Sequence, residues 1–309
     1  MTMLSSVAER LYWTARYLER AESTARLVNA YTQFVLDIPV GFEPGWNSLI
    51  RTIDGEETFE KHYRKYTERN VVKFLIADTD NAGSVRYSIR AARENVRTTR
   101  DCLPESWWEL VNELHLFVGD HAEASIARRN RFEFLERIAA RMQQLRGIVH
   151  SSMPRDQAYR FMRIGSLIEC ADMTSRFVDV AAATTLQVEE TNAPAVEWLW
   201  ANLLRSLSAL SAYRRETGPV TETNEIVDFI FSSKSFARSL HFCLNSIEEE
   251  TEGLSNPRHV WHLVRKTRSA ILGFDAENSS LEDLRKCIDD FQLKLGKLNN
   301  EIYKSWFLR

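Results

Sequence analysis

The stretch AERLYWTARYLERAESTARLVN, residues 8–29, decides the fold. Residues spaced three and four apart run through it and form one stripe along a helix. The stripe, apolar in its first four positions, consists of Val7, Leu11, Ala15, Leu18, Glu22, Ala25 and Asn29. Because residues 3–36 contain neither glycine nor proline, we expect one long helix there.

A second stretch repeats the first. A shift of 150 residues aligns 8–29 with AYRFMRIGSLIECADMTSRFVD (158–179), with seven identities. A shift of 155 aligns FLIADTDNAGSVRYSI (74–89) with FIFSSKSFARSLHFCL (229–244), where five positions keep their residue type. Since both blocks occur in the same order, we interpret the chain as a tandem duplication. We predict an all-α protein of two homologous helical-bundle halves, 1–150 and 151–309, related by a pseudo-twofold axis and packed as one body.

Glycine and proline, with 11 and 7 copies, mark where the other helices end. Residues 37–47, DIPVGFEPGWN, carry two of each and predict a loop. No alternation typical of a strand is present. Further helices are expected at 47–53, 56–67, 70–77, 81–101, 104–117, 130–150, 154–187, 195–212, 222–231, 234–252, 257–272 and 279–306.

The composition is that of an ordinary globular protein, with 44% hydrophobic and 27% charged residues among 309. Its net charge of −3 offers no general attraction for nucleic acid. No stretch approaches the ~20 apolar residues of a membrane span, and the N-terminus lacks the pattern of a signal peptide. The four cysteines form neither a CxxC nor a zinc-like cluster. We therefore expect a cytoplasmic protein with reduced cysteines and no membrane contact.

The repeated element carries charged residues on one helix face in each block. These residues are Glu19, Glu22, Arg26, Glu169, Asp172 and Arg176. Glu22 and Asp172 fall on the apolar stripes and should point inward, where a charge needs a partner. In a structural interpretation, each pairs with the arginine one turn later and fixes how the two long helices meet. In a functional interpretation, all six residues converge on a polar pocket between the halves that binds a cation, an amine or a peptide end.

Glu19 lies one step toward the flank of the stripe, so we expect it to matter less for stability than Glu22. A di-metal carboxylate site would need ExxH motifs, which the chain lacks. His115 follows Glu113 by two residues, the wrong spacing for one helix face. The GxxxxGK[ST], GxGxxG, GxSxG and HExxH motifs are also absent. We expect no metal and no cofactor.

A row of arginines occupies one face of the helix predicted at 81–101. Its members are Arg86, Arg90, Arg93, Arg97 and Arg100, at steps of 4, 3, 4 and 3. None of the positions aligned with them at the shift of 155 is arginine, so the repeat does not need the row to fold. The row is either a binding strip for a phosphate or carboxylate of an acidic partner, or a solvated face, or a set of partners for Glu248 and Glu252. Without interleaved aromatic residues it does not suggest nucleic-acid binding.

Three segments resemble a known bacterial family, the uncharacterised Alpha-E family. The segment RLYWTARYLERAESTARLV (10–28) is similar to its opening signature. Two others, ECADMTSRFVDV (169–180) and ARENVRTTRDCLPESWWELVN (92–112), resemble its internal signatures. The resemblance runs from about residue 3 to the last helix and implies an all-helical domain. It implies that the prominent acids of the family are here Glu19, Glu22, Glu169 and Asp172, whereas Ser166 and Cys170 depart from the family pattern.

Alpha-E proteins are typically encoded near an ATP-grasp peptide-ligase-like protein and a transglutaminase-like protease, and some clusters encode a proteasome-like peptidase. The resemblance therefore implies a role in peptide synthesis, modification or turnover. Because the chain shows no nucleophile–base pair, we expect a non-catalytic accessory or scaffold protein that contacts such partners. The alternative is an enzyme, or a small-molecule or peptide-binding protein, that uses the acidic–arginine pocket.

Overall fold

The structure is a computed structural model that describes residues 3–37, 45–188 and 193–308. Helices make up 78% of the chain, and the described residues contain no strand, which confirms the expected all-α fold. Most of the loop predicted at 37–47 lies outside the described residues. Within those described ranges, no helix combines the length and apolar character needed to cross a bilayer.

Fourteen α-helices and two short 3-10 helices, η1 (Arg100–Cys102) and η2 (Ala124–Ile126), are described. The α-helices are α1 (Ser5–Asp37), α2 (Asn47–Thr52), α3 (Glu56–His62), α4 (Glu68–Ile76), α5 (Val85–Arg97), α6 (Glu105–His121), α7 (Arg128–Ser152), α8 (Gln157–Val188), α9 (Ala193–Ser206), α10 (Leu210–Glu216), α11 (Thr223–Ser232), α12 (Leu240–Thr251), α13 (Arg258–Leu272) and α14 (Leu281–Trp306).

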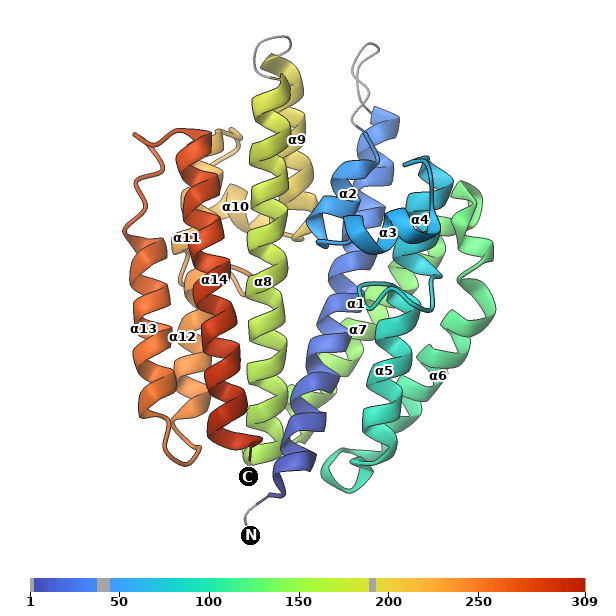
Figure 1. The fold of residues 1–309 in the computed structure, drawn as a ribbon, viewed down its shortest axis with the longest axis vertical. Helices are drawn as coiled ribbons and strands as arrows, with labels where there is room; N and C mark the ends of the chain where they lie inside the picture. Colours follow the sequence, from blue (N-terminus) through green and yellow to red (C-terminus); the bar gives the residue numbers. More distant parts are fainter. Residues whose placement is uncertain (1–2, 38–44, 189–192, 309) are drawn as a thin grey trace.

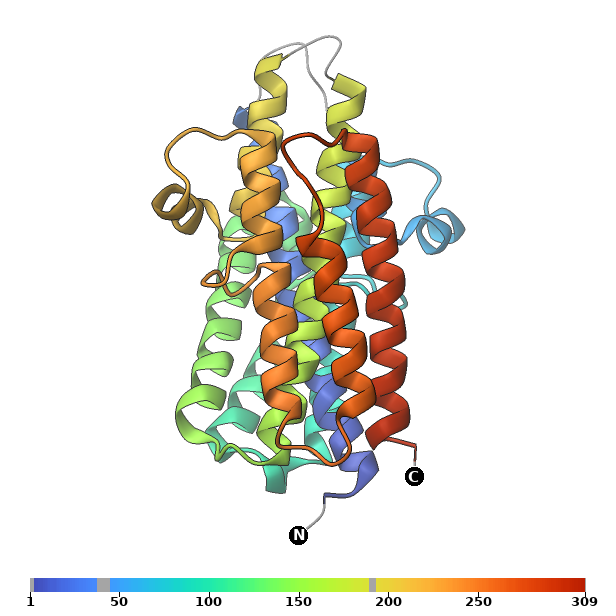
Figure 2. The ribbon, with the colours of Figure 1, turned by 90° about the vertical axis from the view of Figure 1, so that its left-hand side faces the viewer.

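The two longest helices, α1 and α8, form the centre of the molecule. Both begin at the same end and run side by side in the same direction (Figures 1 and 2). Helices α5 and α7 pack on α1, while α12 and α14 pack on α8. The apolar stripe predicted for the first helix is buried along the inner face of α1, so the contact between α1 and α8 organises one continuous core.

A glycine allows the backbones of α1 and α8 to approach closely. A Cβ atom at Gly165 would lie 2.3 Å from the carbonyl oxygen of Tyr12, which is closer than real Cβ contacts allow. Tyr12 itself is buried, and its hydroxyl donates a hydrogen bond to Asn299 of α14 (2.6 Å). The side chain at position 165 therefore sets the spacing between the central helices.

Helix positions agree with the sequence pattern, but some boundaries differ. The helix predicted from residue 81 begins at Val85, because the Ser84 side chain caps it by accepting a hydrogen bond from the Tyr87 backbone N–H (3.0 Å). The helix predicted from 234 begins only after Ser239, which forms the same kind of cap. The single helix predicted at 195–212 is wrong, since the chain turns at Ser208, where φ is +54°, and separates α9 from α10.

The loops that precede α5 and α12 close through matching hydrogen bonds. Each contact in one loop has a counterpart whose residues lie 150 or 155 positions further along the chain, as in the sequence alignment. The hydrogen bond from Thr24 to Gly83 O matches the one from Thr174 to Arg238 O. The bond from Ser84 to Asp78 O matches the one from Ser239 to Ser233 O. The bond from Ser88 to Ala82 O matches the one from Cys243 to Ala237 O. The pseudo-twofold relation between complete halves stays a prediction.

Replacing Gly165 by alanine should destabilise the protein. The added methyl group meets a backbone oxygen that cannot move without separating α1 from α8. We expect the free energy of unfolding to fall by about 1–3 kcal/mol in urea titrations followed by circular dichroism. Gly147→Ala, on the exposed face of α7 with no atom within 4 Å of the new Cβ, is the control. It should gain about 0.5–1 kcal/mol, and equal effects of the two changes would contradict the close approach.

Candidate functional site

Three glutamates are buried where the central helices meet their neighbours. Glu19 and Glu22 of α1 are 4% and 0% exposed, and Glu169 of α8 is 1% exposed. An ionised carboxylate removed from water is strongly destabilising unless cations and hydrogen-bond donors replace the water. The structure supplies such partners in two separate groups.

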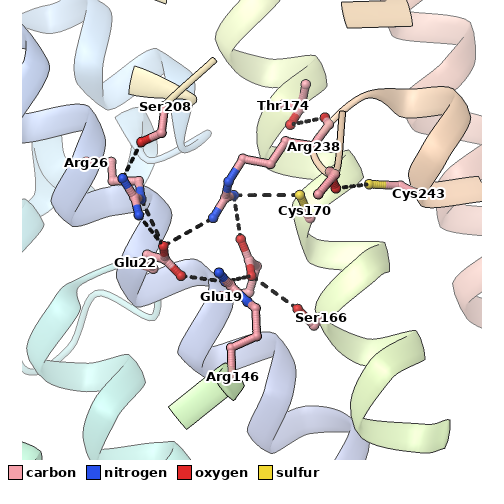
Figure 3. Close-up of polar contacts among 11 residues, drawn as sticks. Glu19, Glu22, Arg26, Arg146, Ser166, Cys170, Thr174, Ser208, Arg238 and Cys243 are labelled. Atoms are coloured by element: carbon pink, nitrogen blue, oxygen red, sulfur yellow. Dashed lines mark hydrogen bonds and ion pairs between the residues drawn. The ribbon is translucent and has the colours of Figure 1, made fainter. Parts of the chain in front are cut away.

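The first cluster surrounds Glu19 and Glu22 (Figure 3). Arg146 of α7 bridges the two carboxylates, with its Nη2 atom 2.8 Å from Glu19 Oε2 and 2.6 Å from Glu22 Oε2. Arg238, from the loop before α12, places Nη1 2.6 Å from Glu19 Oε1 and Nη2 3.3 Å from Glu22 Oε1. Arg26 pairs with Glu22 at 2.7 Å, which confirms the pairing predicted from their spacing. Every oxygen of the two carboxylates therefore contacts a guanidinium group.

Neutral side chains complete the first cluster. The Ser166 hydroxyl donates a hydrogen bond to Glu19 Oε2 (3.1 Å), and Arg26 donates one to the hydroxyl of Ser208. The buried Cys170 lies with its Sγ atom 3.6 Å from Arg238 Nη1. Ser166 and Cys170 are thus parts of this cluster.

Three arginines face two glutamates in the first cluster, so the group carries one excess positive charge. Burial alone would raise the pKa of Glu19, but Arg238 and Arg146 outweigh it and lower that pKa to about 2. A hydrogen bond with Cys243, together with the Arg238 charge, also lowers the pKa of the Cys170 thiol. The cluster therefore keeps Glu19 ionised across the physiological pH range.

The second cluster surrounds Glu169. Arg16 and Arg20 of α1 bind its two oxygens, with Nε atoms at 2.7 Å and 2.5 Å. Burial raises the pKa of Glu169, but the two arginines lower it further than burial raises it. Asp172 pairs with Arg176 at 2.9 Å, as their spacing predicted, and both side chains are only partly buried. The inward orientation expected of Asp172 is therefore reached only in part.

The two clusters do not form one pocket, so the predicted convergence of all six residues is wrong. Glu19 and Arg20 are neighbours in the chain but lie about 100° apart around the helix and reach opposite clusters. The cavity beside the first cluster has a volume of only about 50 Å³ that the centre of a water molecule can reach. In the cavity beside the second cluster this volume is about 350 Å³. Only the second has room for a small organic group.

Glu19, which was expected to matter less for stability than Glu22 because of its flank position, is buried as well. Helices α7 and α8 enclose α1 on both sides, so the flank of the stripe is buried together with its centre. Glu19 accordingly contacts two arginines and a serine. The repeat signature did not identify the cations that neutralise the glutamates, which are Arg16, Arg20, Arg146 and Arg238.

Four members of the arginine row lie on α5, and Arg100 lies in η1 because the helix predicted to reach residue 101 ends at Arg97; the row forms local contacts. Arg86 is 4.0 Å from Glu123, and Arg97 is 3.1 Å from Glu94. Glu248, considered above as a partner for the row, instead pairs with Arg265 and Arg268. Glu252 is exposed and forms no ion pair with any residue that the structure describes. Pairing of the row with the acids of the other half is therefore wrong.

Aromatic rings do accompany the row, contrary to the sequence interpretation. Arg93 and Arg100 lie over the ring of Trp108 from α6, at 5.7 and 4.6 Å from its centroid. Arg90 lies over Tyr87 at 5.2 Å. The tryptophan is distant from the row in sequence, so the spacing within α5 did not reveal it. These rings orient the guanidinium groups along the surface.

No group of three or more histidine, cysteine, aspartate or glutamate side chains in the described part of the chain has an arrangement that could hold a metal ion. The family model Alpha-E, described as a predicted alpha-helical domain with a conserved ER motif, matches residues 3–307. No curated protein and no solved structure matches the chain.

The chain contains four Glu-Arg dipeptides, and one differs from the others in its environment. They are Glu9–Arg10, Glu19–Arg20, Glu68–Arg69 and Glu136–Arg137. Only Glu19–Arg20 has a buried glutamate. It is also the one dipeptide of the four that lies in the clusters.

Glu19→Ala and Glu22→Ala should destabilise the protein to a similar degree. Each change leaves buried guanidinium groups without their counter-charge, which costs about 3–5 kcal/mol when burial is deep. Urea unfolding provides the measurement. The glutamine variants should lose less, because the amide oxygen still accepts hydrogen bonds from arginine. Glu109→Ala, on the exposed face of α6, should stay within about 0.5 kcal/mol of wild type. Wild-type stability of Glu22→Ala would refute the buried ion pairs.

Acid should destabilise the protein through Glu19. Its pKa falls from 4.5 to about 2 on folding, so its stabilising contribution is complete above pH 4.5 and is lost as the pH falls toward 2. The loss for this one group should be on the order of 3 kcal/mol. Urea unfolding at several pH values measures it, and Glu19→Gln should remove that part of the slope. Glu109→Gln is the control. If the free energy of unfolding of Glu19→Gln depended on pH as steeply as that of wild type, the assignment would be contradicted.

Proposed function

The chain belongs to the Alpha-E family, and we propose that it is a non-catalytic helical accessory protein. It acts in the cytoplasm beside an ATP-grasp peptide-ligase-like protein and a transglutaminase-like protease, in peptide synthesis, modification or turnover. A proteasome-like peptidase is a further partner in this proposal. These partners derive from the resemblance to the family.

The observation that supports this proposal is that arginines contact every oxygen of the buried carboxylates. Each oxygen of Glu19, Glu22 and Glu169 contacts at least one arginine. A general acid or base needs a pKa near the working pH and a free path to its substrate. Burial raises the pKa of Glu19 and of Glu169, but the arginines lower both further, away from that range. The acids of the clusters are therefore suited to holding helices together and poorly suited to proton transfer.

Glu19–Arg20 is our assignment for the conserved ER motif of the family. Glu19 links α1 to α7 through Arg146 and to the loop before α12 through Arg238. Arg20 links the same helix to α8 through Glu169. A dipeptide that joins α1 to three other parts of the chain explains why a family would keep both residues.

We propose that the chain consists of two duplicated halves, 1–150 and 151–309, related by a pseudo-twofold axis. The matched loop contacts support it, because three pairs of hydrogen bonds keep the same spacing along the chain. A further correspondence is that Asp54, between α2 and α3, and Ser208, between α9 and α10, both have φ of +54°. Superposition of the two halves of an experimental structure would test the relation.

The arginine row is the surface that we assign to an acidic partner. It lies on α5 and η1 and has no arginine at the aligned positions of the second half, so it marks one half of the molecule only. Local acids and rings orient its side chains, of which Arg90, Arg97 and Arg100 are exposed and Arg86 and Arg93 are partly buried. The competing hypothesis, an enzyme or a small-molecule or peptide-binding protein, is favoured by one observation, the roomy cavity beside the second cluster.

Reconstitution tests the accessory role. The purified chain should form a complex with the neighbouring ATP-grasp-like or transglutaminase-like protein in analytical size-exclusion chromatography, with and without ATP. The chain alone should show no ligase or protease activity, and addition of it should change the activity of the partner. Turnover of a peptide substrate by the chain alone, lost in Glu19→Gln, would contradict the proposal.

Replacement of Arg90, Arg93 and Arg97 by glutamine should weaken the complex without unfolding the protein. Exposed charge pairs contribute roughly 0–1 kcal/mol each, so the melting temperature should change by only a few degrees. Binding of the partner should lose most of its dependence on salt. Glutamine at Arg69, Arg129 and Arg214, which are exposed and form no ion pair among the described residues, is the matched control. A large loss of stability would mean that the row serves folding.

A further inference from the structure

The cavity beside the second cluster lies between α8 and two loops of the first half. Its walls include Glu169, Asp172 and Arg176 from α8, Arg20 from α1, and the loops at 53–55 and 80–83. Its volume of about 350 Å³ lies at the lower end of the range of about 300–1,000 Å³ typical of small-molecule sites. It is bounded by charged groups on more than one side.

The charges that line this cavity do not balance. Glu169 is satisfied by Arg16 and Arg20, and Asp172 has a single partner, Arg176. Two further lining carboxylates, Asp54 and Asp80, form no ion pair and no side-chain hydrogen bond as acceptors with any residue in the described ranges. An additional cation placed here would meet Asp172, Asp54 and Asp80.

The first cluster shows which kind of cation fits this setting. There the loop before α12 is fixed by a hydrogen bond from Thr174 of α8 to the Arg238 carbonyl (3.2 Å). From that position Arg238 extends its guanidinium group to Glu19 and Glu22 of α1 (Figure 3). A guanidinium group thus bridges the two acids.

In the second cluster the matching position carries glycine. The loop before α5 is fixed by a hydrogen bond from Thr24 of α1 to the Gly83 carbonyl (3.1 Å), and Gly83 lines the same cavity as Glu169 and Asp172. Gly83 has no side chain to fill the space. The cavity therefore lies where an arginine at position 83 would extend.

We propose that this cavity binds a ligand through a guanidinium group, supplied by free arginine or by an arginine side chain of a peptide. In the second cluster, this group enters the place that corresponds to the one that Arg238 fills in the first cluster. There it binds Asp172, Asp54 and Asp80. The planar fork of a guanidinium can bind two carboxylates at once, which a lysine ammonium does with less geometric fit. The proposal deepens the proposed role in peptide metabolism, but it concerns this chain alone.

Isothermal titration calorimetry of the whole chain with N-acetyl-argininamide tests the site. N-acetyl-citrullinamide has nearly the same shape without the charge, and it should bind about tenfold to a hundredfold more weakly, because the charge-assisted hydrogen bonds are lost. Equal binding of the two, no measurable binding of the arginine derivative, or equal binding of N-acetyl-lysinamide would overturn the proposal. Tighter binding of the peptide Ala-Arg-Ala than of the single residue would support a peptide source, and equal binding would support free arginine.

Substitution of Asp54 and Asp80 tests whether the ligand binds in this cavity. The double variant Asp54→Asn, Asp80→Asn should bind the arginine derivative about tenfold or more weakly. Asparagine tolerates the positive φ of position 54, so the fold should persist. The double variant Asp228→Asn, Asp289→Asn, at exposed aspartates of α11 and α14 in the other half, is the control with the same charge change. Wild-type affinity in the double variant would place the ligand elsewhere and overturn the proposal.

Gly83→Arg provides the opposite test. Position 83 does not have a positive φ, and an added Cβ would be tight only against side-chain atoms, Asn81 Oδ1 and Ile53 Cδ1, both at 3.2 Å. The new arginine should occupy the cavity, abolish binding of the arginine derivative and keep or raise the melting temperature. A folded variant that still binds the derivative would overturn the proposal. Because the assays use no partner protein, their failure would leave the accessory role intact.

Discussion

The structure depends on pairing three carboxylates with arginines inside the core where α1 and α8 pack. Removing a carboxylate from water costs several kcal/mol even after relaxation, and only guanidinium groups at close range offset that cost. The arginines come from α1, from α7 and from the loop before α12, so the carboxylates can be satisfied only when these elements are correctly placed. Since a folded protein is stable by about 5–15 kcal/mol in total, a wrong arrangement of helices that left one such charge unpaired would not persist.

Buried ion pairs of this kind specify an arrangement more than they add stability. The apolar stripe of α1 would pack against many surfaces, because hydrophobic contacts have no direction. Glu19 and Arg20 remove that freedom, since one must reach α7 and the loop before α12 while the other must reach α8. Such a role explains how charged residues persist in the middle of a helix that is otherwise suited to a core.

The two clusters use the same helix positions but differ in how their charge is neutralised. In the first, cations from other helices and loops bind the acids of α1, and the space around them is nearly filled. In the second, Arg16 and Arg20 bind Glu169 directly from the facing helix, where the first cluster has Ser166 and Cys170 at the aligned positions. Because Glu169 is satisfied by its neighbour, the loop before α5 needs no arginine, and a glycine there leaves a cavity. Two clusters built on aligned positions can in this way leave one site closed and the other open.

Sequence patterns were enough to predict the helical class, the approximate position of nearly every helix, and the two pairs Glu22–Arg26 and Asp172–Arg176. All of these follow from spacing along one helix, where residues three or four apart are neighbours. The burial of Glu19, the turn of Arg20 to the opposite cluster, and the neutralisation of the acids of α1 by Arg146 and Arg238 depend instead on how the helices pack. Local periodicity identifies the face that is buried, but it does not reveal how much of the flank a neighbouring helix covers. Nor does it identify which arginine, more than a hundred residues away, meets a buried acid, because that depends on how all the helices pack.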